Sequence, residues 1–159
     1  MFKKISLLLF KVLMLFDKIL KFTLNRRFLP LLEEFYLKSS YKQITLLDNK
    51  IKFFIPNQLT EYRVETFFTK EPDMLGWIDS FTKKDNLIFW DIGANIGLYS
   101  IYNALKNKSS ITISFEPSTS NLRCLSRNIS INKLENKVKI FSTPITNIEN
   151  KFFLMNESH

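Results

Sequence analysis

The sequence predicts an α/β fold: an open, parallel sheet preceded by a helical arm and a small β-hairpin. Short apolar runs alternate with helix-like segments, an order that predicts parallel strands joined by right-handed crossovers. The strands are expected at 87–90, 111–115 and 138–141, and the helices at 97–106 and from 118 or 119 to about 131. Gly93 and Gly97, two of only 3 glycines, share the first strand-to-helix turn, which indicates a need for backbone freedom there.

Outside this alternation the sequence predicts further elements, several of them marked by a turn-forming or capping residue. In the first part of the chain we expect a helix at 2–22, an arm closed by Pro30, and one or two helical turns at 31–38. A hairpin of 43–47 and 51–55 is expected around Asp48-Asn49-Lys50, followed by a helix at 73–81 capped by Asp73. A further strand is expected at 151–155. With 159 residues, we expect an arm at 1–40 and a partial sheet domain at 41–159.

Cysteine and histidine are almost absent, which excludes several kinds of site. Cys124 is the only cysteine, so there is no intrachain disulfide, and a cysteine-based metal site is disfavoured. This usage points to a reducing, cytoplasmic compartment, with Cys124 as a buried residue on a helix. His159 is the only histidine and lies at the end of the sequence, so no Ser/His or Cys/His pair is expected within the chain.

The net charge of +8 is concentrated at the N-terminus. Residues 1–30 hold 7 basic residues and 1 acid, Asp17, whereas the other 129 residues hold 16 basic and 14 acidic groups. The sheet domain is therefore nearly neutral, which argues against nucleic acid as a partner.

The arm at 2–22 has three competing interpretations. Its lysines gather on one side of a helical wheel, and Lys4, Lys11 and Lys18 recur every seven residues. Lys11 interrupts the apolar run that a spanning helix needs, and no small-residue cleavage site follows as in a signal peptide. A peripheral helix on the inner face of a membrane fits best. A helix packed on its own domain or on a partner subunit is an equal alternative.

The loop from Asp91 to Gly97 is the expected ligand site, because ligands of open α/β sheets bind beyond the carboxyl ends of the strands. Gly93 lets a ligand approach the backbone, Asn95 tolerates positive φ and offers an amide, and Gly97 allows close helix–strand packing. The helix N-terminus that follows suits an anionic group such as a carboxylate.

Acidic residues at two strand ends suggest which ligand the loop takes. A carboxylate at Asp91 would repel the pyrophosphate of a dinucleotide, but it suits the ammonium group of S-adenosylmethionine, which has no phosphate. Glu116 follows the next strand and is placed to accept hydrogen bonds from ribose hydroxyls. Because NAD could use Glu116 too, Asp91 is the discriminating residue.

Several motifs together resemble the FkbM-type S-adenosylmethionine-dependent methyltransferases. The matching segments are LIFWDIGANIGLYS at 87–100, Phe115-Glu116-Pro117, residues 128–137, Lys70-Glu71-Pro72 and Trp77-Ile78-Asp79. The resemblance covers about residues 44–155. It implies a seven-stranded, Rossmann-like class I methyltransferase sheet and O-methyl transfer, often to a sugar or similar hydroxyl acceptor.

By position, the resemblance also implies site residues. Asp91, Gly93, Asn95 and Gly97 would hold the methionyl part and Glu116 the ribose. Residues 142–144 would approach the adenine. Glu71 would close over the cofactor, with a plain helix-entry acid as the equal alternative.

The resemblance sets an expectation about length as well. Only 18 residues follow Phe141, so we expect a sheet truncated after its third parallel strand, whose first strand is an open edge for a complementing chain or oligomer. Such a chain would bind the cofactor weakly or not at all, and its catalytic base cannot be named. The alternative is a non-catalytic vestigial module whose arm binds a membrane or a partner protein.

Overall fold

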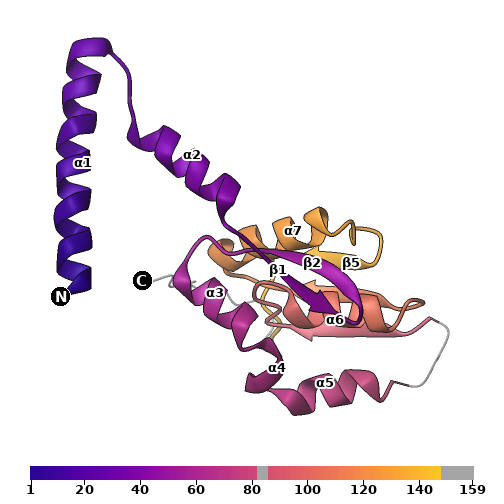
Figure 1. Cartoon of the computed structure of the whole chain (residues 1–159). Helices are drawn as coiled ribbons and strands as arrows, with labels where there is room; N and C mark the ends of the chain where they lie inside the picture. The colour runs from indigo at the N-terminus through magenta and orange to yellow at the C-terminus, as the bar shows by residue number, and fades with distance from the viewer. Residues whose placement is uncertain (82–85, 148–159) are drawn as a thin grey trace. The chain divides into compact units, whose positions relative to one another are not determined.

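The structure, a computed structural model, describes residues 1–81 and 86–147 (Figure 1). The chain separates into two units, Met1–Ser40 and the part that begins at Tyr41. The second unit holds a parallel sheet with helical crossovers, so the predicted α/β class is confirmed. The expected strand at 151–155 and His159 lie outside the described residues.

The first unit contains α1 (Phe2–Leu24) and α2 (Leu29–Ser39). The long helix is confirmed, but Pro30 does not close it. Pro30 lies in the first turn of α2, where an N–H is not needed for helical bonding. α1 ends instead at Asn25, which has a left-handed φ of 51°. No helix among the described residues combines the length and apolar content needed to cross a membrane.

A β-hairpin opens the second unit. β1 (Tyr41–Leu46) pairs antiparallel with β2 (Asn49–Phe54). Leu47 and Asp48 have φ of 48° and 63°, so they form the two-residue turn with positive φ that matches strand twist. The hairpin is confirmed, although its turn lies at 47–48 rather than at 48–50.

Three short helices follow the hairpin: α3 (Gln58–Glu65), α4 (Phe67–Lys70) and α5 (Pro72–Asp79). The first two were not predicted from the sequence. Asn57 caps α3 by accepting a hydrogen bond of 2.9 Å from the Thr60 amide. The prediction that Asp73 caps the third helix is wrong, because Pro72 begins the helix and places Asp73 in its first turn.

The parallel sheet contains β3 (Ile88–Ile92), β4 (Ile111–Phe115) and β5 (Val138–Phe141) in the order β3-β4-β5. α6 (Leu98–Lys106) and α7 (Thr119–Ile131) are the crossovers. Ser118 caps α7 by accepting a hydrogen bond of 3.3 Å from the Asn121 amide. Cys124 is buried in α7, as predicted, and burial raises the pKa of its thiol.

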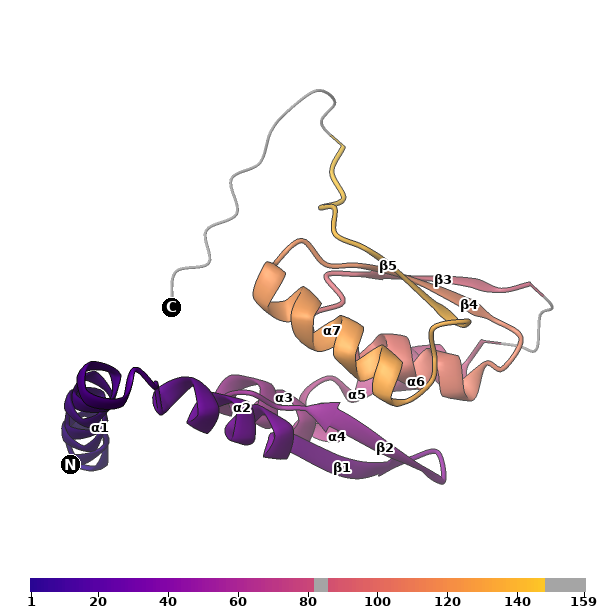
Figure 2. The ribbon, with the colours of Figure 1, turned by 90° about the horizontal axis from the view of Figure 1, so that it is seen from above.

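The second unit has layers: α6 and α7 lie between the three-stranded sheet and the hairpin (Figure 2). Asn128 of α7 joins these layers. Its amide oxygen accepts a hydrogen bond of 2.6 Å from the Phe54 amide, and its amide nitrogen donates one of 2.8 Å to the Ile96 carbonyl. One turn later, Asn132 bonds both the N–H and the carbonyl of Lys52.

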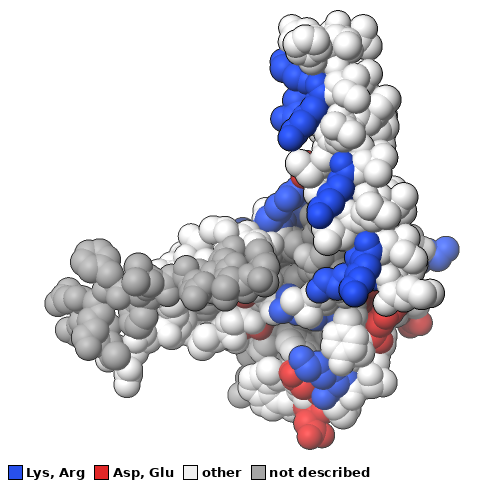
Figure 3. Space-filling model, turned by 90° about the vertical axis from the view of Figure 1, so that its left-hand side faces the viewer, with Lys and Arg blue, Asp and Glu red and all other residues white. Residues whose placement is uncertain are grey.

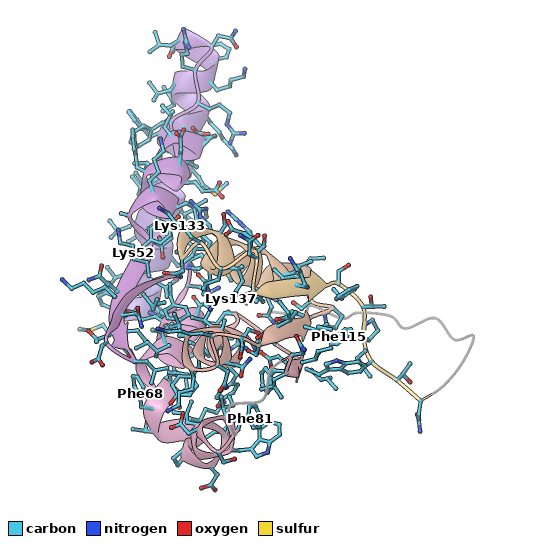
Figure 4. The ribbon with its side chains drawn as sticks, turned by 90° about the vertical axis from the view of Figure 1, so that its right-hand side faces the viewer. Lys52, Phe68, Phe81, Phe115, Lys133 and Lys137 are labelled. Atoms are coloured by element: carbon cyan, nitrogen blue, oxygen red, sulfur yellow. The ribbon has the colours of Figure 1, made fainter. Side chains whose placement is uncertain are left out.

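The other face of the sheet is apolar and open. Ile88, Trp90 and Ile92 are each more than half exposed, whereas Phe89 and Asp91 between them are buried. Phe115, labelled in Figure 4, lies on this outer face between the rings of Trp90 and Phe141, at centroid distances of 5.4 and 5.5 Å. One face of β3 is thus open, because α6 and α7 cover only the other face.

We predict that Asn128→Ala lowers the free energy of unfolding by about 2–4 kcal/mol, since it leaves a buried N–H and a buried carbonyl without this partner. Urea unfolding followed by circular dichroism measures the change. Asn132→Ala is the matched control, with an expected loss below about 1 kcal/mol because its bonds to Lys52 lie at an exposed position. Equal losses in both variants would contradict this role of Asn128.

Candidate functional site

The loop between β3 and α6 is held against the end of β4. The amides of Gly93 and Ala94 both donate to the Phe115 carbonyl, at 2.9 and 3.0 Å, and the Gly97 amide donates to the Ala94 carbonyl at 2.8 Å. Gly93, Asn95 and Gly97 all have positive φ, of 76°, 54° and 87°. The predicted need for backbone freedom at these residues matches the conformation of the loop.

Gly97 is also required by packing, although not by the contact that the sequence suggested. A Cβ at this position would lie 2.5 Å from Cδ1 of Leu125, a fully buried residue of α7. The residue therefore allows the start of α6 to approach another helix, rather than the close helix–strand packing expected from the sequence.

Asp91 is buried on the helix-facing side of the sheet, with 6% of its surface exposed. Its carboxylate accepts a short hydrogen bond from the Ser100 hydroxyl, which also lies 2.7 Å from the Ser114 hydroxyl. Burial raises the pKa of Asp91, the nearby charge of Glu116 adds to the rise, and hydrogen bonds from Ser100 oppose it. Asp91 thus places a negative charge where solvent stabilises it poorly.

Glu116 is buried as well and braces two turns at once. One carboxylate oxygen accepts a hydrogen bond of 2.7 Å from the Asn95 amide, and the other accepts one of 2.8 Å from the Ser118 amide. Glu116 follows β4, so this single side chain fixes the loop after β3 relative to the turn that begins α7.

A hollow lies beside the loop. Its walls come from α3, α4 and the first turn of α6, and its lining includes Arg63, Lys70, Glu71, Asn95 and Tyr99. Both basic side chains therefore border the same space as the loop backbone. Of the site residues predicted from the sequence, Glu71, Gly93 and Asn95 line this hollow.

Glu71 reaches across the hollow instead of capping a helix. It precedes α5, but its side chain makes no capping bond there. Its carboxylate accepts a hydrogen bond of 2.8 Å from the Tyr99 hydroxyl of α6. Burial raises the pKa of Tyr99, and the hydrogen bond to Glu71 adds to the rise, so the phenol stays a donor.

Arg63 also lines the hollow, although it was not predicted from the sequence. Its guanidinium donates to the side-chain oxygens of Asn95 and Asn121, at 2.5 and 3.1 Å. These oxygens are neutral, so neither bond compensates the charge of Arg63. The capping pair Asn57 and Thr60 is the signal that could have revealed α3, and with it Arg63, from the sequence.

The structure thus arranges the predicted residues in two groups. Gly93, Asn95 and Glu71 line the hollow. Glu116 holds the loop from a buried position, and buried Asp91 accepts its hydrogen bond from Ser100 of α6. Residues 142–144 follow β5 at the same edge of the sheet and are exposed. The site combines two buried carboxylates with two basic side chains at its border.

No protein-family model and no curated protein matches this chain. Among solved structures, it is similar to P. horikoshii TYW2 in complex with MeSAdo, at 19% identity over 66% of this chain and 36% of that chain, with a TM-score of 0.47. M. jannaschii TYW2 in complex with AdoMet gives 19% identity, 64% and 42% coverage, and a TM-score of 0.45.

The C-terminal domain of the precorrin-6Y C5,15-methyltransferase of Rhodobacter capsulatus gives 21% identity, 48% and 40% coverage, and a TM-score of 0.41. The chain spans at most 42% of the length of these three structures.

We predict that replacing each glycine by alanine changes the free energy of unfolding by a different amount. Gly97→Ala should lower the free energy of unfolding by about 2–4 kcal/mol, because positive φ and the contact with Leu125 both oppose a side chain. Gly93→Ala should lose about 1–2 kcal/mol from φ alone, since nothing lies within 4 Å of its added Cβ. Thermal unfolding monitored by circular dichroism measures both.

Gly76→Ala is the control, because Gly76 lies inside α5 with open space around it. The substitution should be neutral or stabilising by up to about 1 kcal/mol. A Gly97→Ala protein as stable as the Gly76→Ala protein would contradict the packing described for the loop.

Proposed function

We propose that the hollow beside the β3–α6 loop binds S-adenosylmethionine and that the chain belongs to a methyltransferase that uses it. One observation supports this most strongly: Asp91 and Glu116 are buried carboxylates beside a loop whose hollow is bordered by Arg63 and Lys70. Charges of both signs around one small site complement a zwitterion. The methionyl end of S-adenosylmethionine carries an ammonium and a carboxylate, and its sulfonium adds a further positive charge.

The two carboxylates favour the cationic part of this ligand. The charge of Glu116 contributes to the raised pKa of Asp91, and a bound cation would offset that repulsion. A pyrophosphate would bring more negative charge to the same place, so a dinucleotide is disfavoured. Asp91 alone supported this choice in the sequence, and the proximity of Glu116 strengthens it.

Arg63 and the start of α6 favour the anionic part. The guanidinium bonds two neutral amide oxygens, so it retains its full charge for a ligand carboxylate. The N-terminal end of α6 adds positive potential next to Asn95 and Gly97. These groups would orient the methionyl part with its carboxylate toward Arg63.

The remaining assignments follow from geometry together with the resemblance. Each oxygen of Glu116 holds one backbone N–H and can accept a second hydrogen bond, so ribose hydroxyls can share it. Residues 142–144 are proposed for the adenine. Glu71, tied to Tyr99 across the hollow, is proposed to cover the bound cofactor.

The acceptor is proposed from the FkbM-type resemblance alone: a hydroxyl of a sugar or of a similar small molecule. When bound, S-adenosylmethionine supplies the methyl group on its sulfonium, and the protein has to hold the acceptor in line with it. A hydroxyl acceptor also has to lose its proton to a base, and we assign that role to no described residue.

A second candidate function, a non-catalytic module that binds another protein, is favoured by the open face of the sheet. Ile88, Trp90 and Ile92 expose a contiguous apolar row that a second copy or a complementing chain could cover. Cofactor binding separates the two candidates, since the module needs none.

Calorimetric titration of the full chain with S-adenosylmethionine and, separately, with NAD tests the proposal. We expect weak but saturable binding of S-adenosylmethionine, because the chain supplies only part of a cofactor pocket. We expect no saturable heat with NAD, because the buried carboxylates oppose a pyrophosphate. Binding of NAD without binding of S-adenosylmethionine would rule the proposal out.

Asp91→Asn should weaken S-adenosylmethionine binding by about 10–100-fold, the range for losing a partner of a charged group. Because the pKa of Asp91 is raised in the free protein, affinity should also fall as the pH is lowered through it, and the variant should lose this dependence. Asp73→Asn, the same change at an exposed position on α5, is the control. Unchanged affinity in Asp91→Asn would contradict the role of this carboxylate.

A further inference from the structure

We propose that α1 lies flat on a membrane surface that carries anionic lipid, with its lysines toward the headgroups and one apolar side in the acyl boundary. This inference goes beyond the proposed function and does not depend on it. It concerns the unit Met1–Ser40 alone.

The first observation is an apolar arc that α2 leaves uncovered. Leu8, Leu9, Val12, Leu15 and Ile19 are between 51% and 63% exposed. At 3.6 residues per turn they share about a third of the helix circumference, and no charged residue falls within it. Leucine and valine side chains exposed to this degree along several turns of one helix form a surface suited to burial.

The second observation is the charge beside that arc. The lysines of α1 form a row along one side of the helix, visible in Figure 3 as blue atoms beside a white surface. They are Lys3, Lys4, Lys11, Lys18 and Lys21. Lysine stems can extend along the helix while their ammonium groups reach an anionic headgroup layer. A neutral protein surface would not compensate this charge, which favours lipid over a second copy of the same basic helix.

The third observation explains why the arc stays open. Asp17, the only acid of α1, is buried, and its carboxylate accepts hydrogen bonds from the Phe28 and Leu29 amides, at 2.6 and 2.9 Å. Arg27 donates to the same carboxylate at 3.0 Å. These bonds hold the start of α2 against the side of α1 that carries Asp17. On a helical wheel this side is far from Val12, which lies in the middle of the apolar arc. The ion pair with Arg27 also compensates the charge of the one acid in α1 that would oppose an anionic surface.

The positions of the lysines indicate that α1 lies along the membrane surface and does not cross it. Lys11 lies at the middle of α1, so its ammonium group would sit at the centre of a bilayer if the helix crossed it, at high cost. A helix lying in the interface keeps every lysine at headgroup level.

Flotation of the full chain with vesicles tests the proposal. We expect binding to vesicles that contain phosphatidylserine in phosphatidylcholine and weaker binding to pure phosphatidylcholine. Replacing Lys4, Lys11 and Lys18 by Gln should weaken binding to the anionic vesicles by about a hundredfold, near fivefold per lysine. The double variant Leu8→Gln/Leu15→Gln should weaken it by about a hundredfold as well, through lost apolar burial.

The matched control is Leu7→Gln/Met14→Gln, which makes the same kind of change one residue earlier, on the lysine side of the helix. It should keep nearly all binding, with circular dichroism confirming that helical content is unchanged in every variant. Absence of binding to anionic vesicles, or equal loss in the two double variants, would overturn the proposal. So would a dimer in sedimentation velocity without lipid that only Leu8→Gln/Leu15→Gln dissociates, because the arc would then cover a second copy.

Discussion

The carboxylate of Glu116 is the interaction on which the site depends. Its two oxygens accept the amides of Asn95 and Ser118, and so join the turn after β3 to the turn after β4. With both turns fixed, the loop takes the positive φ angles that bring its backbone to the hollow. Burial is the main cause of the raised pKa of Asp91, and the charge of the Glu116 carboxylate adds to it. One side chain thus fixes the shape of the proposed binding site and contributes to its electrostatics.

The two units of the chain use exposed apolar surface differently. In the second unit, α6 and α7 bury Phe89 and Asp91. The alternate residues of β3, Ile88, Trp90 and Ile92, stay exposed on the outer face of the sheet. In the first, the Asp17 carboxylate holds α2 at one side of α1 and leaves a leucine-rich arc open. Only the arc has a row of lysines next to it, which is why a lipid surface is proposed for α1 and not for the sheet.

Much of the second unit could be predicted from sequence, because its signals are local. The strand at 111–115, the helix start at 118 or 119 and the glycines of the loop are each determined within a few residues, and all three predictions are confirmed. The long amphipathic helix at the N-terminus could also be predicted from its sequence pattern. Asp91, Asn95 and Glu116 were also identified as site residues, although their binding roles stay predictions.

What the sequence could not predict depends on contacts between distant residues. Which residues of β3 lie on its open face depends on the crossover helices, which lie on one side of the sheet, and an all-apolar run does not encode this. Gly97 accommodates Leu125, which is 28 positions away in the sequence. Arg63 reaches Asn95 only because α3 returns to the loop, and α3 itself has weak amphipathic character.

The central claim is that the loop braced by Glu116 is a binding site for S-adenosylmethionine. The most direct measurement is a titration of the isotope-labelled chain with this cofactor, followed by amide NMR. We predict that the amide signals of Gly93, Asn95 and Gly97 shift together and saturate at one ligand concentration, while those of α1 do not move. Saturable shifts confined to other parts of the chain, with the loop signals unchanged, would contradict it.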